Sequence, residues 1–330
     1  MAVRHSLYSL RLSANLPIPG LTVLDDPLPA DITIHLKEEK GSVPSLFSLP
    51  SHFSYISPNQ NSDGQPILRA CKLGDSHFGF FYADGARFAV KLDGREIWAD
   101  GPADYALEDT ATYLVGPVMG FVLRLHGILP LHACAVAMRD QAIALVGDQG
   151  AGKSTTAAAF ARQGYAVLSE DLAAVAESGS QLMVQPGYPR VNLWPESAEA
   201  LFGGAHQLPP VTPTWGKHFL ALDPPNHHFQ SEPLPLGSIF ILRERDANSA
   251  APRIEKVSAA QAMTTLVANT YGNYLLDAEM RKTEFEQLGR LLRKTPVYQV
   301  WPSDNPSRVY ELCEAIAAKA QSSAVCSALS

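Results

Sequence analysis

The sequence predicts an α/β protein: a phosphate-binding-loop (P-loop) core preceded by a β-rich N-terminal region. Three observations support this. The first 125 residues consist of short apolar or alternating runs separated by turn signals. From about residue 126 onward, strand patterns alternate with helical patterns, as in sheets covered by helices. A glycine-rich loop in this second part lies between a strand and a helix. We therefore expect two regions, 1–125 and 126–330.

The N-terminal region is expected to contain several short strands. The turn dipeptides Asp84-Gly85 and Asp93-Gly94 separate alternating runs. No long helical pattern appears before residues 109–129, where apolar side chains recur at helical spacing. The expected strands are residues 7–12, 32–36, 78–82, 88–92 and 96–98.

The second region is expected to alternate strands and helices. A helix over 153–163 would end at Gly164, since glycine adopts the left-handed conformation that closes helices. The strand that follows, 165–168, would complete a βαβ unit. The other expected strands are 131–138, 142–146, 183–185, 239–242 and 297–300, and the other helices are 257–269, 282–293 and 306–320.

Composition narrows the classes of protein. The 330 residues are 46% hydrophobic and 18% charged, with a formal net charge of -7, which argues against a nucleic-acid binder. The four cysteines are scattered without a C-x-x-C pair, so they indicate buried thiols rather than a zinc site or disulfide framework. No secretory signal opens the chain, and no apolar run reaches the ~20 residues of a membrane span. A cytoplasmic protein without membrane contact is expected.

A phosphate-binding motif runs from Gly147 to Ser154, matching G-x-x-x-x-G-K-[ST] between a strand and a helix. Glycines let backbone N–H groups point at phosphate oxygens, and the helix N-terminus adds positive charge. Lys153 would reach the β- and γ-phosphates, and Ser154 would bind Mg²⁺, so ATP and Mg²⁺ are the expected cofactors. The motif alone does not separate kinases from other NTPases. The expected nucleotide-binding residues are Gly147, Asp148, Gln149, Gly150, Ala151, Gly152, Lys153, Ser154 and Thr155.

Two further features indicate phosphoryl transfer. Glu170 and Asp171 follow the next expected strand, at the edge of the sheet where the loop lies. Carboxylates there can hold Mg²⁺ or accept a proton from an attacking hydroxyl. His132 stands in the expected strand before the loop strand, from which its ring could reach the same crevice.

At these residues the chain resembles the HPr serine kinase/phosphorylase family. The stretch LHACAVAMRDQAIALVGDQGAGKSTTAAAFARQGYAVLSEDLAAV is similar to the family's catalytic core, and His132, Lys153 and Glu170 fall at the family's histidine, lysine and first acidic residue. The wider chain resembles a subgroup encoded with lasso-peptide biosynthesis genes, which carries the motif seen here as PGYPRVNLWPES. In that subgroup the kinase phosphorylates the C-terminal serine of a precursor peptide.

The resemblance implies a core like the C-terminal domain of HPr kinase. Glu170 would stand at the catalytic base position, where the family normally has aspartate. Asp171 would help Ser154 and Glu170 hold the metal, and His132 would tune Glu170 by hydrogen bonding. The family's second glycine-rich signature, associated with dephosphorylation, is absent, so phosphorylation is favoured. HPr enzymes form hexamers, so a homo-oligomer is also compatible with the resemblance.

Several other side chains allow two interpretations. Arg190 is a candidate catalytic cation, because phosphoryl transfer spreads negative charge over oxygens, but it could equally be a solvated surface charge. The same alternatives hold for Lys217. The pair His227-His228 is not expected to bind zinc, because few other ligands lie nearby. Trp194 and Trp215 are expected in the core or in a pocket wall, and His218 is expected to have no site role.

The sequence leaves four functions open. The favoured one is an ATP-dependent serine kinase acting on a peptide or small protein. The others are HPr phosphorylation in carbon regulation, a non-catalytic nucleotide-binding regulator, and a small-molecule kinase or simple NTPase. For the N-terminal region we expect peptide recognition, for instance by strand addition at a sheet edge.

Overall fold

The computed structural model describes residues 2–25, 27–37, 47, 50–245 and 252–328. The chain forms two compact units. One comprises Met1–Gly127 with Tyr274–Leu276, and the other comprises Ile128–Asn273 with Asp277–Ser330. The expected boundary lay between residues 125 and 126.

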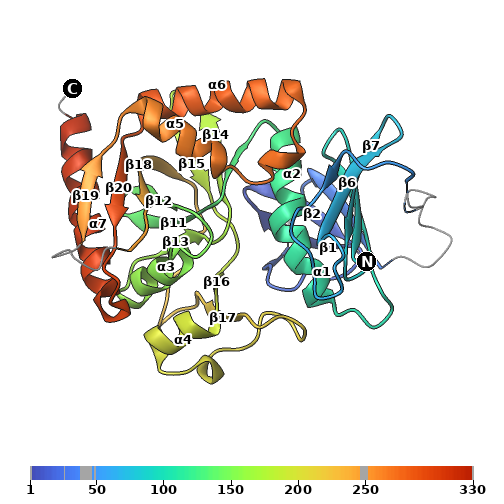
Figure 1. Cartoon of the computed structure of the whole chain (residues 1–330), viewed down its shortest axis with the longest axis horizontal. Helices are drawn as coiled ribbons and strands as arrows, with labels where there is room; N and C mark the ends of the chain where they lie inside the picture. Colours follow the sequence, from blue (N-terminus) through green and yellow to red (C-terminus); the bar gives the residue numbers. More distant parts are fainter. Residues whose placement is uncertain (1, 26, 38–46, 48–49, 246–251, 329–330) are drawn as a thin grey trace. The chain divides into compact units, whose positions relative to one another are not determined.

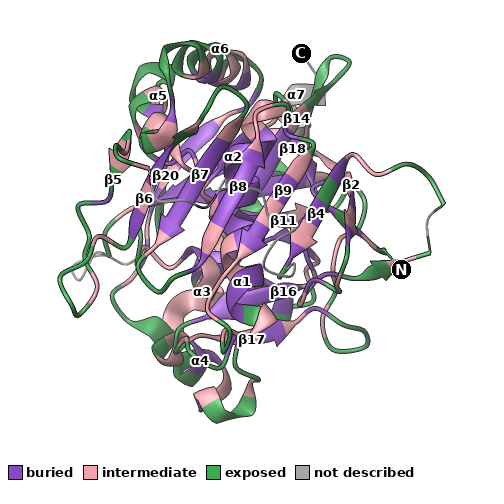
Figure 2. Ribbon diagram, turned by 90° about the vertical axis from the view of Figure 1, so that its right-hand side faces the viewer, coloured by how far each residue is buried: buried purple, intermediate pink, exposed green. Residues whose placement is uncertain are grey.

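The first unit is built on a nine-stranded sheet with the order β3-β1-β2-β4-β9-β8-β7-β6-β5. Strands β6 to β9 form antiparallel pairs, and Figure 2 shows much of β7 and β8 buried. Helices α1 (Leu107–Tyr113) and α2 (Met119–Leu125) complete the unit. The strands are β1 (Val3–Leu7), β2 (Leu10–Ala14), β3 (Val23–Leu24), β4 (Ile32–Leu36), β5 (Tyr55–Ile56), β6 (Leu68–Leu73), β7 (His77–Tyr82), β8 (Arg87–Lys91) and β9 (Glu96–Asp100).

Two expectations for this unit were wrong. The strand expected over 7–12 is a hairpin, because Tyr8 and Ser9 have φ of 54° and 61° and reverse the chain between β1 and β2. The helix expected over 109–129 is interrupted by the π-helical segment Leu114–Val118, which contains Pro117. Proline donates no backbone hydrogen bond, which explains why the regular ladder is disturbed here. Helix α2 ends at Leu125, and Gly127 has a φ of 72°.

The second unit is a mixed sheet with helices on both faces (Figure 1). The order is β10-β14-β15-β18-β12-β11-β13, with β20 beside β18 and β19 beside β20; β16 and β17 form a separate ribbon. The strands are β10 (Leu129–Leu131), β11 (Ala133–Met138), β12 (Gln141–Val146), β13 (Val167–Ser169), β14 (Ala173–Ser178), β15 (Gln181–Gln185), β16 (Arg190–Leu193), β17 (His218–Ala221), β18 (Leu234–Leu242), β19 (Arg253–Lys256) and β20 (Val297–Trp301). The helices are α3 (Lys153–Arg162), α4 (Pro195–Phe202), α5 (Ala259–Ala268), α6 (Ala278–Lys294) and α7 (Val309–Ala328). The expected α/β class is confirmed.

Side chains of the central strands alternate between two cores, because successive residues of a strand point to opposite faces. On β11, Cys134 and Val136 join the core that contains Phe160 of α3 and Ile316 of α7. Ala133 and Ala135 join the core on the other face, which contains residues of α5 and α6. The buried cysteines Cys71, Cys134 and Cys313 are free thiols, while the side chain of Cys326 lies outside the described residues.

The expected βαβ unit has an insertion. Strand β11 lies between β12 and β13 and is antiparallel to both, so β13 is not the direct neighbour of the loop strand. The reason is the tight β11–β12 hairpin, in which Arg139 has a φ of 58°. Strands β12 and β13 still run in the same direction. The loop after β12 and the carboxylates after β13 therefore emerge at the same edge of the sheet.

Within the described part of the chain, no helix combines the length and the apolar character that a membrane span needs.

Candidate active site

The glycine-rich loop joins β12 to α3, which begins at Lys153. Gly150 and Gly152 have φ of 84° and 94°, values that other L-residues rarely adopt. The Lys153 side chain is 7% exposed and lies across the loop, where its Nζ donates to the carbonyls of Gly147 at 2.6 Å and Asp148 at 3.2 Å. Burial lowers the pKa of Lys153.

Glu170 is 2% exposed and follows β13 directly. Its Oε1 accepts a hydrogen bond from Ser154 Oγ at 2.7 Å, and its Oε2 accepts one from Asn192 Nδ2 at 3.1 Å. Burial is the main cause that raises the pKa of Glu170, and the neighbouring charge of Asp171 raises it further. A buried carboxyl with a raised pKa, bonded to the first turn of α3, has the character of a proton acceptor.

Asp171 is held differently. Its Oδ2 accepts a hydrogen bond from Tyr271 at 2.7 Å, and its Oδ1 lies 3.4 Å from His132 Nε2. Burial acts to raise the pKa of Asp171, but the hydrogen bonds from His132 and Tyr271 outweigh it, so the pKa is lowered. The adjacent carboxyl groups thus have pKa values shifted in opposite directions, which is typical of acid–base sites.

The expected bond between His132 and Glu170 is wrong, because the ring pairs with Asp171. His132 lies in the bend between β10 and β11 rather than within a strand. Asp171 has a φ of 65°, a left-handed value. The two carboxyl groups have different partners: Glu170 bonds to Ser154 and Asn192, and Asp171 bonds to His132 and Tyr271.

Strand β16 of the two-stranded ribbon contributes one cation, Arg190, and one amide, Asn192. Arg190 and Asn192 alternate with core residues along β16 and so share a face, and Phe219 is paired with Asn192 across the ribbon. Arg190 is 6% exposed, with its guanidinium 5.2 Å from the Tyr188 ring centroid and 5.5 Å from that of Phe219. Its burial excludes a solvated surface charge. Within the described part of the chain, Arg190 Nε and Asn192 Oδ1 are buried without a hydrogen-bond partner.

Lys217 lies near the carboxylates. Its charge acts to lower the pKa of both Glu170 and Asp171. Its Nζ is 5.0 Å from the ring centroid of Trp194, which is 51% exposed. Of the two positions expected for Trp194, the core or a pocket wall, this exposure excludes the core. Trp215 is half-buried.

The remaining candidate side chains from the sequence lie in different surroundings. The Thr155 hydroxyl bonds to Ser197 of α4 at 2.8 Å, so it is engaged away from the loop. His218 is half-buried, and its Nδ1 has no partner among the described residues. His227 Nδ1 contacts the carbonyl of Ala161 at 3.3 Å. Among the residues that the structure describes, no cluster of three or more His, Cys, Asp or Glu side chains is placed to hold a metal ion.

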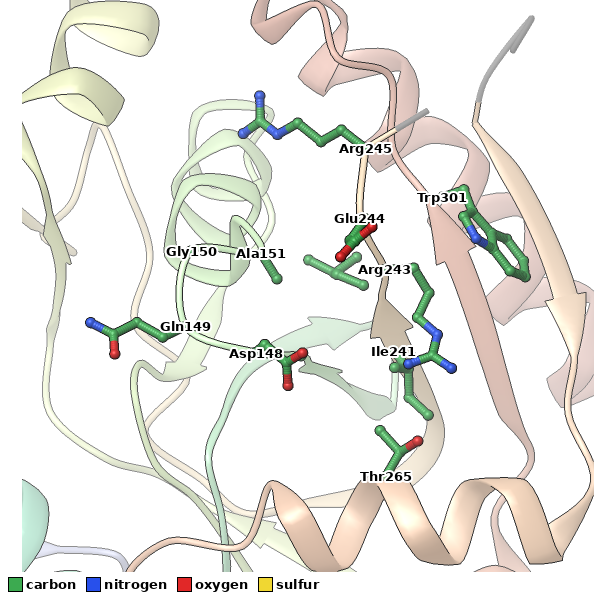
Figure 3. Close-up of a pocket in the computed structure, with 12 residues that line it drawn as sticks. Asp148, Gln149, Gly150, Ala151, Ile241, Arg243, Glu244, Arg245, Thr265 and Trp301 are labelled. Carbon is green, nitrogen blue, oxygen red and sulfur yellow. The ribbon is translucent and has the colours of Figure 1, made fainter. Parts of the chain in front are cut away.

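A cavity of about 790 Å³ lies against the other side of the loop. It is bounded by the loop and by the carboxyl ends of β18 and β20, and Figure 3 shows Asp148 and Ala151 across from Arg243 and Glu244. Thr265 of α5 and Trp301 also line it. Because β18 and β13 lie on opposite sides of β12, the loop is flanked by this cavity on one side and by Glu170 on the other.

The oxygen donors present partly fit a magnesium ion. Mg²⁺ prefers oxygen ligands and usually keeps several waters and phosphate oxygens, so one or two protein donors suffice. Ser154 Oγ and Glu170 Oε1 lie together at 2.7 Å. Both oxygens of Asp171, by contrast, are engaged by other side chains: Oδ2 accepts from Tyr271, and Oδ1 lies 3.4 Å from His132 Nε2.

Sequence reasoning missed Asn192 and Tyr271. Asn192 had a detectable signal, since it stands two residues after Arg190 and strand alternation puts both on one face. Tyr271 had none, because it lies 100 residues from Asp171 in the chain.

Comparisons with known proteins add little. No family model and no curated protein matches the sequence. A solved structure, the HPr(Ser) kinase/phosphatase from Coxiella burnetii, is similar at 10% sequence identity and a TM-score of 0.26, covering 56% of this chain and 92% of its own. A similarity of this size establishes neither the family nor the activity.

Proposed function

We propose that the protein is an ATP-dependent serine kinase of the HPr kinase-like type, acting on a peptide or small protein. The observation that carries this proposal is the position of Glu170. It is a buried carboxyl group with a raised pKa, and it is hydrogen-bonded to Ser154 at the start of the helix that follows the glycine-rich loop. A proton acceptor beside a phosphate-binding loop is a recurring part of sites that transfer a phosphoryl group to a hydroxyl.

The nucleotide would bind across the loop. Backbone N–H groups of residues 148–154 and the start of α3 would hold the phosphates, and Lys153 would exchange its carbonyl partners for phosphate oxygens. The cavity on the side of β18 has room for the nucleoside. Ser154 and Glu170 would hold Mg²⁺. When bound, the ion offsets negative charge on the transferring phosphoryl group.

In the transfer step, Glu170 would take the proton of the acceptor serine hydroxyl. The serine oxygen then bonds to the γ-phosphorus as the bond to the β–γ bridging oxygen breaks, and ADP leaves. Arg190 and Lys217 lie on the β16–β17 side, where their charge would stabilise the transferring group. His132 and Tyr271 would keep Asp171 ionised.

For the acceptor, we propose a peptide whose serine approaches along the β16–β17 ribbon. Trp194 is exposed beside Lys217 and offers an aromatic contact surface. The resemblance to lasso-cluster kinases suggests a C-terminal serine. The N-terminal unit remains a candidate for peptide recognition, but its outer strands β3 and β5 are two residues each and offer few backbone groups for strand addition.

The test is phosphate transfer by the full chain with labelled ATP and Mg²⁺. The acceptors are a peptide ending in serine, the same peptide ending in alanine, and HPr. We expect labelling of the serine peptide alone, abolished by Lys153→Ala and Glu170→Ala and retained by Lys282→Ala, which removes an exposed lysine of α6. Calorimetry with Mg²⁺-ATP runs beside it. ATP binding without transfer to either acceptor would overturn the kinase proposal and favour a nucleotide-binding regulator.

A further inference from the structure

A second cavity, of about 500 Å³, lies at the other end of β20. It is formed where β20 begins, α5 begins and α6 ends, together with part of α7. The nucleotide-side cavity is lined by Trp301, the last residue of β20, whereas this one is lined by Val297, the first. The two cavities are therefore separate sites. The polar side chains that line the second cavity include Lys256, Arg293, Lys294, Lys319, Ser322 and Ser323.

The charge of this cavity is entirely positive. Four cationic side chains line it, and no aspartate or glutamate does, although the chain as a whole carries a net charge of -7. Among the described residues none of the four forms an ion pair: Lys294 donates to the carbonyl of Ser180, and Lys319 Nζ lies 5.0 Å from the ring centroid of Tyr298. Glu255, next to Lys256, is paired with Arg253 instead. Four clustered cations repel one another unless an anion offsets them.

Backbone donors add to this charge. Helix α5 has ten residues, and its first turn faces the cavity through Ala259 and Ala262. The side chain of the N-cap Ser258 accepts from Gln261 N, and this leaves the N–H groups of Ala259 and Ala260 without an intrahelical acceptor. The partial positive charge of the helix N-terminus therefore has the same sign as the side chains.

We propose that this cavity binds a small anion carrying two or more phosphate groups. One phosphate would lie between Lys256 and the start of α5, and another between Arg293 and Lys319. The hydroxyl groups of Ser322 and Ser323 donate to the carbonyl of Lys319, at 2.8 and 2.9 Å, so the phosphate contacts come from the cationic side chains and the start of α5. The cavity volume fits a ligand larger than a single inorganic ion. This inference does not depend on the proposed kinase function.

The experiment is calorimetric titration with pyrophosphate at constant ionic strength. All proteins carry Lys153→Ala, which removes the loop lysine as a competing phosphate contact. The test protein adds Lys256→Gln and Arg293→Gln. The matched control adds Arg281→Gln and Lys282→Gln, which remove the same charge from the opposite end of α6. All four side chains are exposed, so the variants are expected to fold, and melting curves check this.

We expect pyrophosphate affinity to fall about tenfold or more in the test protein, because two charge-assisted contacts are lost. The control should stay within about twofold, the effect of a distant surface charge. Equal losses in the two proteins, or no binding by the Lys153→Ala protein, would overturn the proposal. Citrate titrated in parallel separates the ligand classes: if it binds as tightly as pyrophosphate, the assignment to phosphate groups is wrong.

Discussion

Replacing Gly147 with alanine tests the loop conformation most directly. A Cβ at this position would lie 2.7 Å from the carbonyl oxygen of Leu242 and 3.1 Å from the Ala151 Cβ. Ordinary van der Waals contact begins near 3.4 Å, so the first distance must open by about 0.7 Å. Leu242 ends β18 and is paired with Val300 of β20, so its carbonyl is held in the sheet. The loop must therefore move.

The expected losses of stability and of nucleotide affinity follow from this close contact. Overpacking of this kind costs about 1–3 kcal/mol of folding free energy. The movement also displaces the Gly147 carbonyl, which accepts the Lys153 Nζ hydrogen bond at 2.6 Å. If the loop holds the nucleotide phosphates, we expect Mg²⁺-ATP to bind at least about tenfold more weakly, which corresponds to about 1.4 kcal/mol.

Urea denaturation and calorimetry measure the two effects. Gly150→Ala is the matched control, since Gly150 has a φ of 84° and nothing lies within 4 Å of its added Cβ. Its cost is conformational, about 1–2 kcal/mol, without a clash against β18. Gly147→Ala should lose more affinity than Gly150→Ala. Wild-type affinity in Gly147→Ala, or the reverse order of the two variants, would refute the reasoning.

Three further predictions concern stability. Burial is the main cause that lowers the pKa of His5, whose neutral ring bonds to the Thr22 carbonyl and accepts from the Ile18 N–H. Protonation therefore opposes folding, and stability should fall as the pH drops below about 6.5, the unfolded pKa. The pH dependence of the melting temperature should be shallower in His5→Gln, and equal slopes would contradict this. Phe160→Ala, in a fully buried position, should lower the free energy of unfolding by about 3–5 kcal/mol in urea melts; a loss below 1 kcal/mol would count against the described core. Ser258→Ala removes the N-cap of α5 and should cost about 1 kcal/mol by the same measurement, and no loss would argue against the cap.

The local elements around the loop could be predicted from sequence. The expected strand 142–146 and helix 153–163 agree with β12 and α3 to within one residue at each end. Their signals are local, since an apolar run, glycines and a helical pattern follow one another directly. The insertion of β11 between β12 and β13 could not be predicted in this way. It depends on pairing between strands, which sequence periodicity does not encode.

Part of the candidate site could likewise be predicted from the sequence, and part could not. That Ser154 and Glu170 lie close together could be predicted, because β12 and β13 run in the same direction and end at the same edge of the sheet. The partners of each carboxyl group do not follow, because they are set by the left-handed conformation at Asp171 and by contacts distant in sequence. Tyr271 stands in a segment without any motif, and the Asn192 contact requires the fold of the β16–β17 ribbon.

Helix α5 lines both cavities of the second unit. Ala259 and Ala262 lie on the wall of one cavity, and Thr265 lies on the wall of the other. The six-residue step from Ala259 to Thr265 spans only about 9 Å along the helix axis, so a small tilt or shift of α5 would displace both cavity surfaces together. A substitution in α5 that shifts the helix would therefore change the walls of both cavities.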